Sequence, residues 1–319
     1  MPSSTTGPRP FRFAAQLSRP TDLTSRGWAE LARKAEGLGY SALLMPDHFG
    51  EQLAPVPALA AAAAATEHLR LGALVFGNDY RHPVVLAKEA ATLDLLSDGR
   101  LEIGLGAGWM RSDYDQAGMA YDPPATRVGR LEEAVEVLTG LLGAEGPFSF
   151  TGRHYRVADH ALFPRPVQRP RPPVIVGGGG RRVLSLAGRR ADIVSINVNL
   201  RDGTGGPEVA PDASPESTRR KVGWVRAAAR ERFGGLELNT LVGFAVVTDR
   251  ASSVYEAMAP AFGVTAEDVR HVPLALVGTL EEIEEELRWR REEYGISYFS
   301  VEAECWEALA PVVQRLTGT

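Results

Sequence analysis

Asp47 and His48 are the residue types that acid–base chemistry uses most. They follow an apolar run, SALLM, which ends at Met45. A carboxylate beside an imidazole can hold the imidazole in one tautomer for proton transfer, or the pair can bind a ligand hydroxyl group. An aspartate that caps a turn next to a packed histidine gives the same sequence. The pair alone therefore leaves a catalytic and a structural interpretation open.

A run of four glycines indicates a different chemistry, the binding of an anion. The glycines are Gly177, Gly178, Gly179 and Gly180. They follow the apolar residues 174–176 and precede Arg181 and Arg182, where a helix is expected to begin. Glycines let backbone N–H groups approach a phosphate, and a helix N-terminus adds a partial positive charge. A flexible turn is the alternative, since the run is not the GxxxxGKS or GxxxxGKT loop of nucleotide hydrolases.

Other motifs in the chain are too incomplete to indicate a function. The segment GLGAG at residues 104–108 lacks the full spacing of a dinucleotide-binding loop and the acidic residue that follows one. His82, His154 and His160 lie far apart and match no zinc-binding pattern. The single Cys305 excludes an intrachain disulfide, and no G-x-S-x-G sequence supports serine hydrolysis. We therefore predict no metal site and no hydrolase.

Alternating strands and helices must position these residues. Residues 69–109 contain a strand, a helix and a second strand, and both strands are continuously apolar. Such strands belong to a parallel sheet that is covered on both faces. The other expected strands are residues 11–17, 41–45, 174–176, 192–198, 238–247 and 296–301. Eight strands alternating with helices predict an α/β fold, the (β/α)8 TIM barrel, whose ligands bind at the C-terminal ends of the strands.

Two segments depart from this alternation. Residues 110–173 are longer than one crossover requires, and we interpret them as an insertion after strand 4. They hold an amphipathic helix at 127–142, a hairpin at 148–157 and a proline-rich connector at 163–173. Residues 199–217 show no periodicity and are expected to form a mobile loop.

Composition limits the class of protein. Of the 319 residues, we expect residues 1–10 to form a flexible tail and residues 11–319 to form one domain. A net charge of -5 gives no attraction to nucleic acid or to an anionic membrane. Residues 54–65 are too short and too rich in alanine to span a bilayer, and residues 1–10 lack the apolar core of a signal peptide. A cytoplasmic protein with a small-molecule substrate is therefore expected.

The motifs together resemble the luciferase-like superfamily of flavin and deazaflavin oxidoreductases. The resemblance covers most of the first 200 residues, in order. Its motifs are Met45-Pro46-Asp47-His48-Phe49, Arg81-His82-Pro83 with Ala87-Lys88, TLDLLSDGR at 92–100, GLGAGW at 104–109, Phe150-Thr151-Gly152, PRPVQRP at 164–170, Pro172-Pro173 and the glycine run. The resemblance implies a barrel with an insertion, in agreement with the strand pattern found independently.

The resemblance also implies where a reduced flavin-type cofactor binds. The phosphate is expected at the glycine run, and the ring at the third strand, where a non-prolyl cis peptide bond is expected at Leu74-Val75. Asp47, Gly106 and Gly108 are assigned to the same cofactor site. His82 and Trp109 are assigned to the substrate side.

Two branches of the superfamily use different cofactors. The Pro-Asp-His-Phe sequence resembles the branch that uses the deazaflavin coenzyme F420, which implies hydride transfer with His48 as proton-transfer group and Asp47 as the residue that positions cofactor or imidazole. Trp109 stands where sugar-phosphate dehydrogenases of that branch carry a catalytic glutamate, which favours an apolar substrate. An FMN-dependent two-component monooxygenase and a non-catalytic flavin-binding barrel are the alternatives. A homodimer is expected, with the helices after strands 2 and 3 at its interface.

Overall fold

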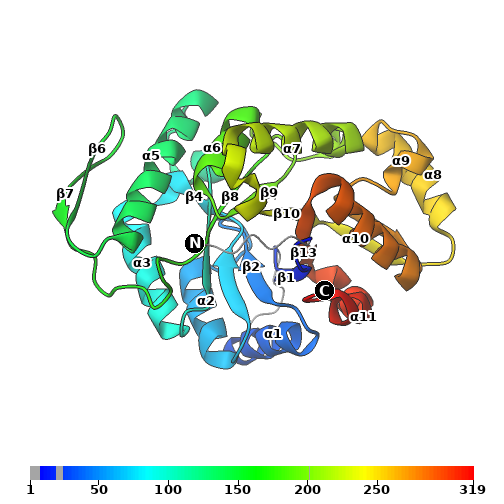
Figure 1. Cartoon of the computed structure of the whole chain (residues 1–319), viewed down its shortest axis with the longest axis horizontal. Helices are drawn as coiled ribbons and strands as arrows, with labels where there is room; N and C mark the ends of the chain where they lie inside the picture. Colours follow the sequence, from blue (N-terminus) through cyan, green and yellow to red (C-terminus); the bar gives the residue numbers. More distant parts are fainter. Residues whose placement is uncertain (1–7, 19–23, 201) are drawn as a thin grey trace.

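Eight parallel strand positions close into a barrel in this computed structural model, which describes residues 8–18, 24–200 and 202–319 (Figure 1). The order is β3-β2-β1-β13-β10-β9-β8-β5, and a β3–β5 pairing closes the ring. The strands are β1 (Arg12–Gln16), β2 (Ala42–Met45), β3 (Arg70–Ala73) continued by β4 (Phe76–Gly77), β5 (Leu101–Gly106), β8 (Val174–Gly178), β9 (Ile193–Ile196), β10 (Glu237–Val242) and β13 (Ile296–Glu302). The predicted (β/α)8 barrel is confirmed. Residues 1–7 of the predicted tail lie outside the described residues.

Helices surround the barrel, and some of them begin at a residue whose side chain caps the first turn. The α-helices are α1 (Ser25–Gly37), α2 (Pro55–Ala65), α3 (Pro83–Leu96), α4 (Arg111–Ala117), α5 (Pro124–Gly143), α6 (Arg181–Arg190), α7 (Pro215–Ala229), α8 (Ala251–Phe262), α9 (Ala266–Val269), α10 (Leu280–Tyr294) and α11 (Trp306–Leu316); the short 3-10 helices are η1 (Asn78–Tyr80), η2 (Pro207–Ala213), η3 (Arg230–Gly235) and η4 (Ala303–Cys305). Thr24 accepts a hydrogen bond from Gly27 N at the start of α1. Thr279 and Glu282 form a reciprocal capping box at the start of α10.

The insertion after β5 has the elements expected of it. The helix α5 packs against α3 and α6, so it occupies the place of an ordinary barrel helix. The antiparallel hairpin of β6 (Phe148–Thr151) and β7 (Arg156–His160) lies beyond α5, at the left edge of Figure 1. The Glu133 carboxylate of α5 accepts hydrogen bonds from backbone N–H groups of the turn that joins the two strands. The hairpin is thereby fixed to the barrel helix that precedes it.

Three details differ from the sequence-based expectation. The expected strand at 238–247 is two strands, because the chain leaves the barrel at Gly243 and β11 (Phe244–Val247) pairs outside it with β12 (Ala275–Gly278). The helix α4 was not predicted. Part of the expected loop at 199–217 is the 3-10 helix η2, and α7 already begins at Pro215. Within 238–247 the apolar pattern is nearly continuous, so only Gly243 marks the change of direction.

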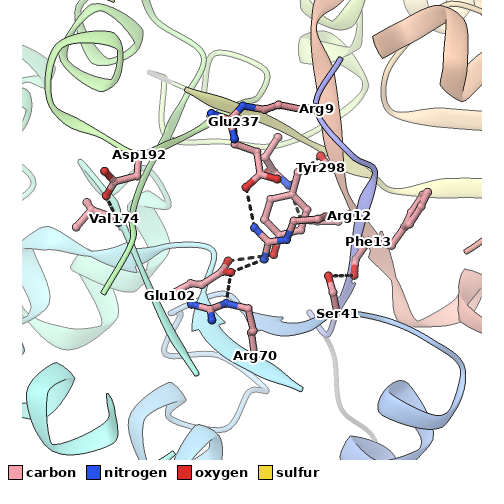
Figure 2. Close-up of polar contacts among 12 residues, drawn as sticks. Arg9, Arg12, Phe13, Ser41, Arg70, Glu102, Val174, Asp192, Glu237 and Tyr298 are labelled. Carbon is pink, nitrogen blue, oxygen red and sulfur yellow. Dashed lines mark hydrogen bonds and ion pairs between the residues drawn. The ribbon is translucent and has the colours of Figure 1, made fainter. Parts of the chain in front are cut away.

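Charged side chains fill the N-terminal end of the barrel interior. Figure 2 shows Arg12 between Glu102 and Glu237, from β1, β5 and β10. The distance from Arg12 Nη1 to Glu237 Oε2 is 2.7 Å, and Arg70 Nε lies 2.6 Å from Glu102 Oε1. Tyr298 Oη donates to the other oxygen of Glu102. The two buried carboxylates are thus paired with arginines that are only partly exposed, as burial of a charge requires.

The pKa of Glu237 gives a first testable prediction. Burial raises this pKa, with a further contribution from the Glu102 carboxylate, and Arg12 offsets only part of the rise. A carboxyl group whose pKa is higher in the folded state stabilises the fold below its unfolded pKa of about 4.3. That contribution is lost as the pH rises through the folded pKa. Glu237→Gln should therefore gain stability relative to the wild-type protein between pH 4 and pH 7, measured by urea unfolding at each pH.

The control for this prediction is Glu256→Gln, which alters an exposed carboxyl group on α8. Its stability relative to the wild-type protein should not change over the same pH range. A Glu237→Gln protein that loses relative stability as the pH rises would contradict the assigned direction.

Candidate active site

A cavity of about 790 Å³ opens at the C-terminal ends of the barrel strands. Its volume lies in the range typical of sites for small molecules and cofactors. Most of the residues assigned to a site from the sequence line it. These residues are Asp47, His48, Leu74, Val75, Gly106, Gly108, Trp109, Gly177, Gly178, Gly179 and Gly180. The fold therefore brings together segments that are up to 133 residues apart in the chain, from Asp47 to Gly180.

The imidazole of His48 is held by a carboxylate from a distant segment. His48 Nδ1 lies 2.7 Å from Asp113 Oδ2, and Asp113, on α4, is almost fully buried. Because Asp113 is a hydrogen-bond acceptor when ionised, we assign the N–H to Nδ1, which leaves Nε2 as an acceptor. The ring of Trp109 meets the imidazole edge-on at 5.5 Å between centroids. His48 thus has one fixed tautomer beside the cavity.

Two further donors hold the Asp113 carboxylate in place. Tyr80 Oη donates to Asp113 Oδ2 at 3.0 Å, and the backbone N–H of Phe49 donates to Oδ1 at 3.3 Å. Burial raises the pKa of Tyr80, and the neighbouring Asp113 charge raises it further. The phenol therefore remains protonated at neutral pH and keeps donating. A fixed carboxylate that orients an imidazole is the arrangement that proton-transfer sites use.

Asp47 does not contact the imidazole, contrary to one of the two roles expected for it. Its carboxylate faces Arg81 instead, with 2.7 Å from Arg81 Nη1 to Oδ2 and 3.2 Å from Nη2 to Oδ1. The backbone N–H of Gly77 also donates to Oδ2. Asp47 therefore ties the end of β2 to the end of β4 and to the turn before α3. It still lines the cavity, so its contact with a cofactor stays a prediction.

One wall of the cavity is the third strand, where the peptide bond between Leu74 and Val75 is cis, as expected. The glycines of β5 pack directly behind it. A Cβ at Gly106 would lie 2.5 Å from Val75 Cγ2, and one at Gly104 would lie 1.9 Å from the Ala73 carbonyl oxygen. The spacing of the GLGAG segment therefore follows from the close approach of two strands.

Gly108 is required for a different reason. Its φ is +73°, and a Cβ there would lie 2.0 Å from Tyr114 Oη. Arg127, a buried residue of α5, donates to the Gly108 carbonyl oxygen. The turn after β5 is thereby fixed, and with it the position of Trp109.

At the opposite wall the glycine run leads from β8 into α6. Gly180 is the N-cap of α6 and provides no side-chain hydrogen bond to the first turn. Arg181 and Arg182 line the cavity beside these backbone N–H groups, and the Arg182 guanidinium is paired with Glu132 of α5. A helix N-terminus together with guanidinium groups suits a phosphate.

The four glycines do not have equal roles, and this difference can be tested. A Cβ at Gly179 would lie 2.4 Å from the Val198 carbonyl group, whereas at Gly180 the nearest atom, in Asn199, is 3.8 Å away. Gly179→Ala should therefore lower the free energy of unfolding by about 1–3 kcal/mol. Gly180→Ala is the matched control and should change it by less than about 0.5 kcal/mol. Urea unfolding measures both, and equal stabilities would contradict the packing role of Gly179.

His82 is the one sequence-assigned site residue that does not line the cavity. It is the N-cap of α3, where its Nδ1 accepts a hydrogen bond from Val84 N, and its ring meets Tyr155 edge-on at 5.2 Å. His82 therefore caps α3, and its contact with substrate stays a prediction. Its sequence motif, Arg81-His82-Pro83, is explained by the Arg81–Asp47 pair and by the proline at the start of α3.

Sequence reasoning missed several residues of the site. Asp113 and Tyr80 hold the imidazole, and Gln16 lines the cavity from the end of β1. The only signal for Asp113 was its place four residues after Trp109. Within the described part of the chain, no group of three or more His, Cys, Asp or Glu side chains could hold a metal ion. No helix there is long and apolar enough to cross a membrane.

The family of the chain follows from comparison with known proteins. Residues 10–294 match the luciferase-like monooxygenase family, so the chain belongs to that family. It is 33% identical over 140 residues to an FMNH2-dependent dimethylsulfone monooxygenase of Pseudomonas putida, over 44% of this chain and 38% of that protein. It is 32% identical over 197 residues to an F420-dependent glucose-6-phosphate dehydrogenase of Nakamurella multipartita, over 58% of this chain and 56% of that one.

The first alignment spans less than half the length of the relative, and the second spans little more than half. The coenzyme F420-dependent tetrahydromethanopterin reductase of Methanopyrus kandleri superposes with a TM-score of 0.75 at 18% identity, over 97% of this chain and 99% of that one. At that identity the likeness shows the fold alone. The relatives thus include proteins named for F420 and proteins named for FMN.

Proposed function

We propose that this protein is an oxidoreductase that transfers hydride between coenzyme F420 and a small organic substrate. The observation that carries the proposal is the His48–Asp113 pair on the cavity wall, with its Nδ1–Oδ2 distance of 2.7 Å. Oxidation of an alcohol removes a hydride from carbon and a proton from oxygen, and the reverse reaction returns both. The cofactor accepts or donates the hydride, and the protein must move the proton.

The residues of this chain suit each part of that task. His48 Nε2 accepts the proton from the substrate oxygen, and Asp113 stabilises the imidazolium that forms. The apolar wall at Leu74 and Val75 would hold the ring of the cofactor. The N-terminus of α6 with its arginines would hold the phosphate and the acidic groups that follow it. The apolar side chain of Trp109 excludes water from the reacting atoms.

An FMN-dependent monooxygenase is the second candidate, because the FMNH2-dependent dimethylsulfone monooxygenase is 33% identical to this chain over 140 residues. The two functions differ in the cofactor that binds. We expect the purified protein to bind F420 at least about tenfold more tightly than FMN, in equilibrium titrations with oxidised and reduced forms of each. Tight binding of FMN with no binding of F420 would overturn the proposal.

The expected homodimer remains a proposal, and an apolar surface supports it. Val85, Leu95 and Leu96 are exposed on α3, and Phe163 of the proline-rich connector is 77% exposed beside them. The connector is held to α3 by a hydrogen bond from Lys88 Nζ to the Phe163 carbonyl oxygen. Exposed apolar patches of this kind mark association surfaces. Leu96→Lys should convert a dimer into a monomer in analytical ultracentrifugation, and a wild-type protein that sediments as a monomer would refute the dimer.

A further inference from the structure

One buried side chain of the cavity has a hydrogen-bonding capacity that the described part of the chain leaves unused. Gln16 is the last residue of β1 and is 3% exposed. Side chains alternate along a strand, so Gln16 shares the inward face of β1 with Arg12 and Ala14. Arg12 belongs to the charged barrel floor, and Ala14 packs in the interior cluster above it. Gln16 is therefore the uppermost inward residue of β1, and it lines the cavity.

Among the described residues, Gln16 Oε1 has no hydrogen-bond partner. Buried polar side-chain atoms are hydrogen-bonded in the large majority of cases, because an unpaired one costs about 1–3 kcal/mol. The amide of Gln52, by contrast, has a partner for each of its polar atoms: its Nε2 donates to the Ser18 carbonyl oxygen and its Oε1 accepts from His48 N. We propose that Gln16 binds the reacting oxygen of the substrate. This inference rests on the proposed function.

The position of Gln16 in the ring of strands favours substrate over cofactor as its partner. Three strands separate β1 from β8 on each side of the ring: β2, β3 and β5 on one, β13, β10 and β9 on the other. The glycine run at the end of β8 therefore lies diametrically across the barrel mouth from Gln16. His48 follows β2, and β2 is the strand that pairs with β1 at Gln16. Gln52 joins the loops that follow these two strands.

The chemistry of a carboxamide narrows the class of substrate. Its oxygen accepts from an alcohol hydroxyl group, and its N–H donates to a carbonyl group, so it holds both forms of a carbon–oxygen redox pair. Apolar residues, among them Leu241, Phe244 and Leu274, also line the cavity. The substrate is therefore an uncharged molecule with one hydroxyl or carbonyl group on an apolar body. Gln16 selects that oxygen and His48 exchanges its proton.

The first measurement concerns stability without any ligand. Gln16→Met keeps the length of the side chain and removes the unpaired amide, so the Tm should rise by about 1–2 °C. Gln168→Met is the matched control, because the Gln168 amide donates to Asp94 Oδ1 at 2.6 Å and to the Leu101 carbonyl oxygen at 2.8 Å. Its Tm should fall. A Gln16→Met protein that loses as much stability as Gln168→Met would overturn the inference.

The second measurement concerns recognition of oxygen and uses the cofactor-free protein. Ligand-observed NMR titrations compare benzyl alcohol with toluene, which has a similar shape and no hydroxyl group. We expect the wild-type protein and Gln168→Met to prefer benzyl alcohol about tenfold and Gln16→Met to prefer it no more than about twofold. An unchanged preference in Gln16→Met, or no preference in the wild-type protein, would overturn the inference.

Titrations of the same variants with F420 and FMN separate this inference from the proposed function. Gln16→Met should bind either cofactor within about twofold of the wild-type affinity. A larger loss would assign Gln16 to the cofactor and overturn its role toward substrate. If F420 does not bind the wild-type protein, the proposed function fails. The preference for benzyl alcohol is measured without cofactor, so it tests the role of Gln16 independently of that result.

Discussion

Replacing Asp113 by asparagine is expected to lower kcat about a hundredfold or more, once a substrate is in hand. The asparagine side chain has the same shape but cannot stabilise an imidazolium. It can also turn its NH2 group toward His48 Nδ1 and thereby favour the wrong tautomer. Steady-state kinetics with saturating cofactor measure the effect. Cofactor affinity should change little, because the carboxylate contacts His48, Tyr80 and the Phe49 backbone.

Asp115→Asn is the control for this variant. Asp115 lies two residues further along α4 and is exposed, and its ion-pair partner among the described residues is Arg111 of the same helix. Its replacement should leave kcat within about twofold. Equal kcat values for Asp113→Asn and the wild-type protein would show that the His48–Asp113 pair has no part in the proton transfer. A loss of cofactor binding in Asp113→Asn would instead show that the Asp113 carboxylate maintains the structure of the cofactor site.

The barrel and the general position of the site could be predicted because both follow from local patterns. Continuous apolar runs that end in glycine or polar residues identify parallel strands and their C-terminal ends. Since those ends meet at one face of a barrel, His48, Gly106 and Gly178 were expected to lie together, and all three line the cavity.

The hydrogen-bond partners could not be predicted in the same way. His48 and Asp113 are 65 residues apart, and they meet only because α4 folds back over the barrel mouth. The helix α4 is seven residues long, too short for its apolar pattern to be recognised. Asp47 is next to His48 in the sequence, which suggested that the two side chains interact. Adjacent side chains of an extended segment, however, point in different directions. Its partner, Arg81, is 34 residues away.

Gln16 shows a second kind of limit. A glutamine at the end of a strand is equally consistent with a satisfied core residue and with a ligand-binding one. The distinction depends on whether another group of the fold reaches its amide, and only the three-dimensional arrangement shows that, among the described residues, none does for Oε1. Sequence patterns locate strands and faces, whereas unused hydrogen-bonding capacity is a property of the assembled interior.

The structural role now assigned to Asp47 predicts a large loss of stability on its removal. Asp47→Ala should lower the free energy of unfolding by about 3 kcal/mol, because the Gly77 N–H loses its acceptor and the Arg81 guanidinium keeps only the longer, 3.8 Å contact with Glu89. Urea unfolding measures this loss. The exposed pair of Arg111 and Asp115 provides the matched control, and Asp115→Ala should cost no more than about 0.5 kcal/mol.

A double-mutant cycle separates the two roles that Asp47 could have. Arg81→Met removes the charge whose closer partner Asp47→Ala takes away, so the double variant should be more stable than the sum of the two single losses predicts, by about 1 kcal/mol or more. Additive losses would show that the pair contributes nothing of its own. If Asp47→Ala instead kept its full stability and lost cofactor binding or turnover, the carboxylate would act on the ligand. The 2.7 Å ion pair with Arg81 would then serve to orient Asp47 toward the cavity that both His48 and Asp47 line.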